Sequence, residues 1–174
     1  MQGNDDKYLK VSACLKHLIA YSTEDGPPTR MQFSDVVTAQ DMADTYQVPF
    51  QAGVQQGKVS CLMCSYNAEA MAGGKAWGYG VEGPGSAYDH GGIPSCANRY
   101  LLNDLARTTW KFRGYITSDC WAVQNVGGNC DEKFPAGCNS SARNLKGHNY
   151  THTRAATMNA TLGAGMDKGQ CVGE

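Results

Sequence analysis

The stretch Gly114-Tyr-Ile-Thr-Ser-Asp-Cys120 ends a short apolar run with a hydroxyl, a carboxylate and a thiol. A run of this length between polar segments is typical of a buried strand, and we expect one over residues 114–117. Three further runs have the same character, at residues 8–15, 59–64 and 164–166. Polar residues follow each run, so the sequence predicts four strands that end in side chains suited to binding or catalysis.

Helical patterns separate these strands. Thr38 can cap a helix that starts at Ala39, and Pro49 then starts a second helical segment. Asn98 precedes a helix, and a last helical pattern covers residues 153–162. The apolar stripe of the helix after Asn98 consists of Leu101, Leu102, Leu105 and Trp110. The alternation predicts an α/β fold with parallel strands, either an open doubly wound sheet or part of a (β/α) barrel.

Two connections are too long to be plain turns. Residues 67–95 contain eight glycines, and residues 127–147 contain Cys130 and Cys138. Loops of this size are usually functional or inserted. We expect a Cys130–Cys138 bridge on loop length alone.

Composition excludes several classes of partner. The chain has 15 basic and 16 acidic residues and a net charge of -1, without a basic run of the kind that binds nucleic acid. No stretch approaches the roughly 18 apolar residues of a membrane span. A hydrophobic content of 41% is ordinary for a folded domain. We therefore expect neither a nucleic-acid nor a membrane partner.

Cysteines and glycosylation sequons point to an oxidising compartment. The chain has eight cysteines, and Asn-x-Ser/Thr sequons at Asn139, Asn149 and Asn159. We expect a secreted protein whose export signal lies upstream of Met1. The pair Cys61-x-x-Cys64 also suggests a redox or metal protein, but no second pair completes a tetrahedral ligand set. We therefore expect no metal.

The predicted strand ends would meet at one edge of a parallel sheet, where α/β proteins bind ligands. They carry cationic, hydroxyl, amide and carboxylate groups, which suit a neutral, polyhydroxylated ligand. The four ends are Lys16-His17, Ser65-Tyr66-Asn67, Ser118-Asp119 and Asp167.

Four longer motifs carry a resemblance to a known family. They are Lys10-Val-Ser-Ala-Cys-Leu-Lys-His17, Met63-Cys-Ser-Tyr-Asn67, Ile93-Pro-Ser-Cys-Ala-Asn98 and Gly114-Tyr-Ile-Thr-Ser-Asp-Cys120. Together they closely resemble the N-terminal barrel domain of glycoside hydrolase family 3, above all its plant and fungal β-xylosidase branch. The resemblance covers residues 7–68, 93–126 and, more loosely, 147–167.

For the fold, the resemblance implies a partial (β/α)8 TIM-type barrel of about four βα units. Residues 1–174 would be a fragment of the catalytic barrel, with long inserted loops at about 69–92 and 127–147. The early strands and the C-terminal αβα sandwich domain of the family would be absent.

For the chemistry, the resemblance implies that Asp119 is a carboxylate nucleophile. In the family, the Asp of the Ser-Asp-Cys motif attacks the anomeric carbon and forms a covalent glycosyl enzyme. The chain would belong to a retaining exo-β-glycosidase that needs no cofactor and acts on β-linked xylose, arabinose or glucose units. From the residues alone, Asp119 could equally cap the helix that follows it.

The resemblance also implies binding residues and a disulfide. Lys16 and His17 match the pair that holds sugar hydroxyls, while Met63 and Tyr66 match wall residues of the pocket. Arg30 matches an Arg after the first strand. Core packing is a rival role for Met63, and a structural ion pair is a rival role for Arg30. The pairing of Cys64 with Cys96 is likewise implied.

The departures from the family weaken the expectation of activity. The family's general acid comes from the absent sandwich domain, and the local candidates Glu24, Asp25 and Glu69 do not match it. Trp121 stands where the β-xylosidase branch usually has an acidic residue. We expect the isolated chain to be nearly inert. The alternative is a non-catalytic, secreted sugar-binding or interaction module derived from the same barrel.

Overall fold

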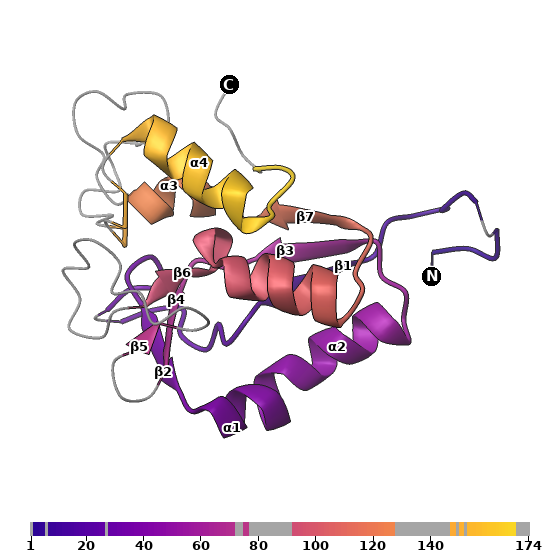
Figure 1. Cartoon of the computed structure of the whole chain (residues 1–174), viewed down its shortest axis with the longest axis horizontal. Coiled ribbons are helices and arrows are strands. Elements are labelled where there is room, and N and C mark those ends of the chain that lie inside the picture. Colours follow the sequence, from indigo (N-terminus) through magenta and orange to yellow (C-terminus); the bar gives the residue numbers. More distant parts are fainter. Residues whose placement is uncertain are drawn as a thin grey trace.

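The computed structural model describes residues 2–5, 7–26, 28–71, 75–76, 92–127, 147–148, 150–151 and 153–169. Most of both expected insertions lies outside these residues, together with Cys130, Cys138, Asn139 and Asn149. The described part contains two small sheets and several helices (Figure 1).

The first sheet is parallel and contains three of the expected strands. Strands β1 (Cys14–Leu18), β3 (Cys61–Cys64) and β7 (Tyr115–Ser118) lie in the order β1-β3-β7. Neighbouring strands therefore follow one another in the chain order, and helices connect them, as parallel pairing requires. This confirms the predicted α/β class with parallel strands.

The expected fourth strand at residues 164–166 is wrong. Ala164 is the last residue of helix α4 (Arg154–Ala164), and Gly165 ends this helix in a left-handed conformation with φ of 113°. Within the part of the chain that the structure describes, one parallel bridge, between Thr117 and Lys168, extends the sheet past β7. The apolar run comes from two different elements. Ala164 ends the helix, and Met166 packs into the core from the turn that follows.

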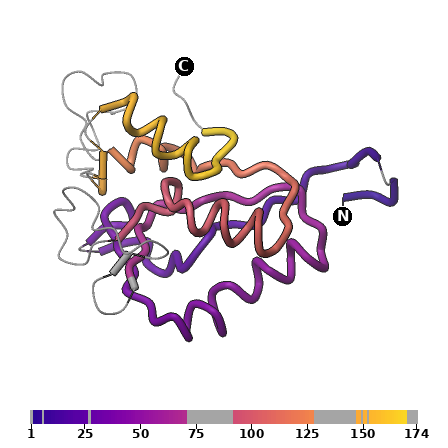
Figure 2. The backbone as a smooth tube through the Cα atoms, viewed as in Figure 1, coloured from indigo at the N-terminus to yellow at the C-terminus, as the bar shows by residue number. Residues whose placement is uncertain are grey.

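The first strand lies further along the chain than residues 8–15. Pairing with β3 sets its place: Cys14 is opposite Cys61 and Leu18 is opposite Cys64, with an irregularity between Leu15 and Leu18. The peptide bonds Lys16–His17 and Leu18–Ile19 are cis. The apolar side chains of Tyr8, Leu9 and Val11 are exposed, in a segment that runs away from the sheet (Figure 2).

A second, mixed sheet was not expected from the sequence. Strand β4 (Ala68–Met71) pairs in parallel with β2 (Ser34–Val37) and antiparallel with β5 (Lys75–Ala76) and β6 (Ile93–Pro94). These strands have two to four residues each, too few for a period to be visible.

The helical run after β2 is continuous. It consists of α1 (Ala39–Asp41), the π-helical segment η1 (Met42–Tyr46) and α2 (Gln47–Gln55). Thr38 caps it, since its Oγ1 accepts from the Asp41 amide at 3.0 Å, which confirms the predicted start. Pro49 does not start a new segment: it lies inside α2, and the wider π turns before it suit a residue without an N–H.

The helix after Asn98 is π-helical segment η3 (Tyr100–Thr109), which follows the single turn η2 (Ser95–Ala97). Its predicted apolar stripe is confirmed: Leu101, Leu102, Leu105 and Trp110 are all buried. In Figure 1 this helix lies between α2 and α4, beside the sheet, in the order of the chain. Its stripe packs with Leu62 and Ile116 of the sheet in one core.

Close backbone approach and disulfides join the sheet to its surroundings. A Cβ on Gly114 would lie 2.1 Å from the carbonyl oxygen of Ser60, so β7 can start there only with glycine. Cys64 and Cys96 form the disulfide that the resemblance implies, with Cα atoms 5.2 Å apart. A second disulfide, Cys14–Cys61, joins neighbouring strands and was not expected.

Candidate active site

The carboxyl edge of the parallel sheet brings three expected residues together. His17 lies near the end of β1, Tyr66 follows β3, and Asp119 follows β7. The Nε2 atom of His17 is 2.9 Å from Oδ2 of Asp119, and both side chains are partly exposed, at 21% and 16%. The pair is therefore open to a ligand from solvent.

Hydrogen bonds hold Asp119 at this edge. Its amide donates to the carbonyl of Cys64 at 3.0 Å, and its Oδ1 accepts from the Cys120 amide at 2.7 Å. The first amide of the next helix, at Ala122, is bonded by the backbone oxygen of Asp119 and not by its carboxylate. Helix capping therefore does not occupy the carboxylate, whose second oxygen faces His17.

The imidazole of His17 favours the neutral form. Burial lowers the pKa of His17 and outweighs the Asp119 carboxylate, which raises it. Because a carboxylate oxygen can only accept, Nε2 of the neutral ring carries the proton and donates it to Asp119. The charge of Lys16 lowers the pKa of His17 further, so this exposed lysine acts on the same ring.

Tyr66 is half-buried beside this pair. Burial, and next the charge of Asp119, raise the pKa of Tyr66 to about 12, so its hydroxyl keeps its proton. Its backbone carbonyl accepts from Nδ2 of Asn125 at 2.8 Å and from Nε2 of His148 at 2.6 Å. Burial lowers the pKa of His148 to about 4, which keeps this ring neutral as well.

Asn125 and His148 support the site although neither was expected there from the sequence. Asn125 belongs to α3 (Ala122–Gly127), which starts shortly after Asp119, while His148 comes from beyond residues 127–147. Neither stands in a motif. The signals were the resemblance over residues 93–126 for Asn125 and the looser resemblance over residues 147–167 for His148.

A segment after β1 covers one side of the pair. Arg30 and Glu24 form an exposed ion pair at 2.6 Å, so the structural role for Arg30 is real. The guanidinium of Arg30 also lies 5.8 Å from the ring centre of Tyr66. The ring of Tyr21 is 5.2 Å from that of His17. Arg30 therefore has the structural ion pair that the sequence left open, and it lies beside a residue of the expected pocket.

Met63 and Trp121 lie close to the site in sequence. Met63 is half-buried in β3, opposite Thr117 of β7, and is not part of the main core cluster. Trp121, two residues after Asp119, is 43% exposed and has φ of 64°.

Ser65 and Asn67 do not line the edge, contrary to expectation. Both are buried, and Ser65 Oγ donates to Oδ1 of Asn67 at 2.5 Å and to the carbonyl of Leu18 at 3.0 Å. Nδ2 of Asn67 donates to the carbonyl of Ile19 at 3.1 Å. Their polar groups are used to hold the end of β1, because buried polar groups need partners inside the protein.

Two buried carboxyl groups complete this network. Nδ2 of Asn67 lies 2.6 Å from Oδ2 of Asp35 and 3.4 Å from Oε1 of Glu69, whose other oxygen accepts from Asn98 at 3.2 Å. Burial raises the pKa of Asp35 to about 7 and that of Glu69 well above its usual range. No cation contacts either group within the described residues, so Glu69 favours the protonated form and Asp35 exchanges its proton near neutral pH.

Asp167 was expected at the same edge but lies elsewhere. It forms an ion pair with Arg107 at 2.5 Å, and its Oδ2 accepts from the Ile116 amide at 2.7 Å. Ile116 is near the start of β7, whereas Asp119 follows its end. Asp167 therefore stabilises the start of the strand and does not belong to the site.

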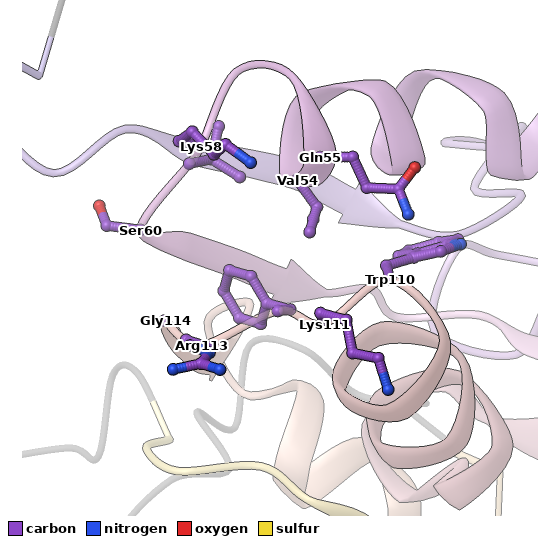
Figure 3. A pocket seen from close by; sticks show the side chains of 10 residues that line it. Val54, Gln55, Lys58, Ser60, Trp110, Lys111, Arg113 and Gly114 are labelled. Carbon is purple, nitrogen blue, oxygen red and sulfur yellow. The ribbon is translucent and has the colours of Figure 1, made fainter.

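A cavity of about 690 Å³ lies at the opposite edge of the sheet (Figure 3). Ser60 and Gly114, just before β3 and β7, line it together with Lys58, Lys111 and Arg113. Lys58 and Lys111 follow the ends of α2 and η3, where cations complement the partial negative charge of a helix end. The helix ends therefore explain the positions of Lys58 and Lys111 without a bound ligand.

Neither a metal site nor a membrane helix is found in the described ranges. No group of three or more His, Cys, Asp or Glu in this part of the chain is arranged to hold a metal ion. Both thiols of Cys61-x-x-Cys64 are used in disulfides to different partners. None of the described helices has the length and hydropathy needed to cross a bilayer.

Known proteins resemble this chain over most of its length. The model of the glycosyl hydrolase family 3 N-terminal domain matches residues 1–167. Probable β-D-xylosidase 6 of Arabidopsis thaliana is 46% identical over 122 residues, which cover 70% of this chain and 13% of the relative. β-Xylosidase/α-L-arabinofuranosidase 2 of Medicago sativa subsp. varia is 41% identical over 164 residues, which cover 94% and 16%.

A solved structure agrees with these relatives. A GH3 exo-β-xylosidase in complex with a xylobiose aziridine activity-based probe superposes with a TM-score of 0.67 at 29% identity, over 92% of this chain and 16% of that one. Fold and similarity together define a glycoside hydrolase domain. The chain belongs to glycosyl hydrolase family 3 and matches its N-terminal domain, and it spans between 13% and 16% of the length of these relatives.

Proposed function

We propose that the chain is part of a retaining exo-β-glycosidase, with Asp119 as the nucleophile. The substrate would be a glycoside with a terminal β-D-xylose, with arabinofuranose or β-glucose as the other candidates. The observation that carries the proposal is the carboxylate of Asp119, which is partly exposed, free of helix capping and 2.9 Å from Nε2 of His17. No cofactor is required for this chemistry.

In the proposed reaction, a carboxylate oxygen of Asp119 attacks the anomeric carbon and forms a covalent glycosyl enzyme. The bond to the leaving oxygen breaks, and that oxygen takes a proton from a general acid. Water then gives a proton to the conjugate base of that acid, attacks the same carbon and releases Asp119 as a carboxylate. Lys16 and His17 would hold sugar hydroxyls, since a lysine donates and a neutral histidine can donate or accept. Tyr66 and Met63 would form walls of the pocket, with Arg30 beside Tyr66.

Glu24 and Glu69 are poor general acids for opposite reasons. Arg30 lowers the pKa of Glu24, so Glu24 is ionised and has no proton to give at neutral pH. Glu69 has a raised pKa, but its side chain is fully buried and cannot reach a substrate. We infer that the acid comes from a part of the protein outside this chain, in the αβα sandwich domain expected from the family.

We infer that the three parallel strands, in chain order and with a fourth position begun at Lys168, are part of a (β/α)8 barrel. Strand β1 is at the edge of the described sheet, where a further strand would pair with it.

Secretion is part of the proposal. Cys14, Cys61, Cys64, Cys96 and Cys120 are all held in disulfides, as expected for an oxidising compartment. Of the three sequons, Asn159 lies on the exposed side of α4. The proposed state is a secreted glycoprotein.

Hydrolysis of two substrates tests the proposal. Loss of general acid help typically costs about 10²- to 10⁴-fold with a poor leaving group and much less with a good one. We expect no measurable hydrolysis of xylobiose, and slow release of dinitrophenolate from an aryl β-xyloside that Asp119→Asn abolishes. Robust xylobiose hydrolysis that is lost in both Asp119→Asn and Glu24→Gln would show that the chain contains its own acid.

The second candidate is a sugar-binding module without catalysis, which is favoured because neither of the described local groups Glu24 and Glu69 is a usable acid. Calorimetric binding of xylobiose, with no release from the aryl xyloside, would support this function over the first.

A further inference from the structure

We propose that Tyr21 is a positioning residue. Its ring holds the imidazole of His17 in place against Asp119 and sets the distance between that imidazole and Tyr66. This rests on the proposed function only in taking His17 and Asp119 as the site. The experiment below measures the His17 ring itself, so it can fail while Asp119 remains the nucleophile.

The ring of Tyr21 contacts one side chain in β1 and one that follows β3. It lies edge-on to His17, with ring centres 5.2 Å apart and an angle of 65° between the planes. It lies 6.0 Å from the ring of Tyr66, at 57°. Both distances are within the range of favourable aromatic pairs. Tyr21 therefore connects the end of β1 to the segment after β3.

The backbone places Tyr21 firmly. Leu18 and Ile19 are fully buried, and Ala20 turns the chain with φ of 55°. A left-handed alanine is conformationally unfavourable, and the surrounding packing must offset its cost. The turn brings Tyr21 back over His17, the residue four positions before it.

The far end of the segment supports the same arrangement. The Arg30 amide donates to the Glu24 carbonyl at 3.3 Å, and the side chains of these residues form an ion pair at 2.6 Å. Arg30 lies on the Tyr66 ring at 5.8 Å. Burial, and then Glu24, raise the pKa of Tyr21 to about 12, so its hydroxyl stays neutral beside the histidine.

The position of Tyr21 has a consequence for proton occupancy. The groups that act electrostatically on His17 are Asp119, Lys16 and Glu24, but burial is the largest influence and lowers the pKa of His17. The Tyr21 ring contributes to that burial. Without the ring, water would reach the imidazole, its pKa would rise, and it would pair with Asp119 as an imidazolium. The neutral donor would be lost in mildly acidic solution.

The test is an NMR pH titration of the His17 ring in the 174-residue chain, assigned with His17→Gln. Tyr21→Phe keeps the ring, so we expect a pKa of His17 within about 0.3 of the unchanged chain. Tyr21→Ala removes it, and we expect the pKa to rise by about 0.5–1. Tyr8→Ala, at a tyrosine that is 66% exposed, is the matched control and should have no effect.

The outcomes separate cleanly. A pKa of His17 that is unchanged in Tyr21→Ala, or that rises as much in Tyr21→Phe, overturns the proposal. If Tyr21→Ala does not fold, Tyr21→Val replaces it, because valine is much smaller than the ring and leaves the imidazole open to water. The same rise is then expected, and its absence counts against the proposal in the same way.

Discussion

The Nε2 atom of His17 lies 2.9 Å from Oδ2 of Asp119, although one residue belongs to the first strand of the parallel sheet and the other follows the third. The strand order brings them together, with the backbone amide of Cys120 on the second carboxylate oxygen. A carboxylate held by two donors and still partly exposed is suited to attack an electrophilic carbon and later to leave it.

The first prediction concerns His17. In His17→Gln the carboxylate loses its charge-assisted donor, worth about 1.5–3 kcal/mol, and a hydroxyl-binding group. We expect trapping of Asp119 by an activated 2-fluoro-xyloside to slow by about 10- to 100-fold. Lys58→Gln, at the opposite edge of the sheet, is the control and should react at the unchanged rate. Equal rates for both variants would mean that His17 does not assist Asp119.

The second prediction concerns pH. The pKa of Asp35 is about 7 in the folded protein against an ordinary value of 3.8, so the folded state binds more protons between these values. By linkage, this group makes the free energy of unfolding decrease as pH rises from about 4 to about 7. His148 acts oppositely, since its lowered pKa of about 4 makes stability increase between pH 4 and 6.5.

Because these effects overlap, a difference between variants is the quantity to measure. We expect urea unfolding of Asp35→Asn to show a gain over the unchanged chain that grows from pH 4.5 to pH 8, by up to a few kcal/mol. Asp25→Asn, at an exposed site, is the control and should show no such trend. A gain for Asp35→Asn that is the same at every pH would contradict the buried, protonated carboxyl group.

The third prediction uses two glycines. A Cβ at position 114 would clash with the carbonyl of Ser60 at 2.1 Å, whereas one at position 163, in the last turn of α4, would meet nothing within 4 Å. We expect Gly114→Ala to lower the free energy of unfolding by about 1–3 kcal/mol or to prevent folding. Gly163→Ala should raise it by about 0.5–1 kcal/mol. Similar values for both would show that β3 and β7 do not start as described.

Much of the site could be predicted because it depends on strand order. Parallel strands separated by helices bring their carboxyl ends to one edge, which is enough to place His17, Tyr66 and Asp119 near one another. Where each strand begins is less predictable, since pairing with β3 sets the limits of β1 while the apolar character of Tyr8 to Val11 suggests an earlier start.

The errors came from residues whose partners are distant in the sequence. Ser65 and Asn67 follow a strand in the same way as Tyr66, and only the buried acids of the second sheet explain why they point inward. In sequence, Asp167 follows an apolar run as a strand-end acid would. Its ion pair with Arg107 gives it a structural role instead. The support of Tyr66 by His148 depends on a contact across 82 residues that has no local signature.

The most direct test of the central claim is covalent trapping. The chain is incubated with a 2-deoxy-2-fluoro-β-xyloside that carries a dinitrophenolate leaving group, which departs without an acid. We predict that intact-mass spectrometry shows addition of one fluoroxylosyl group, that fragmentation places it on Asp119, and that Asp119→Asn remains unlabelled. A label on another carboxylate, or a folded chain that binds the sugar but is never labelled, would contradict the assignment of Asp119 as the nucleophile.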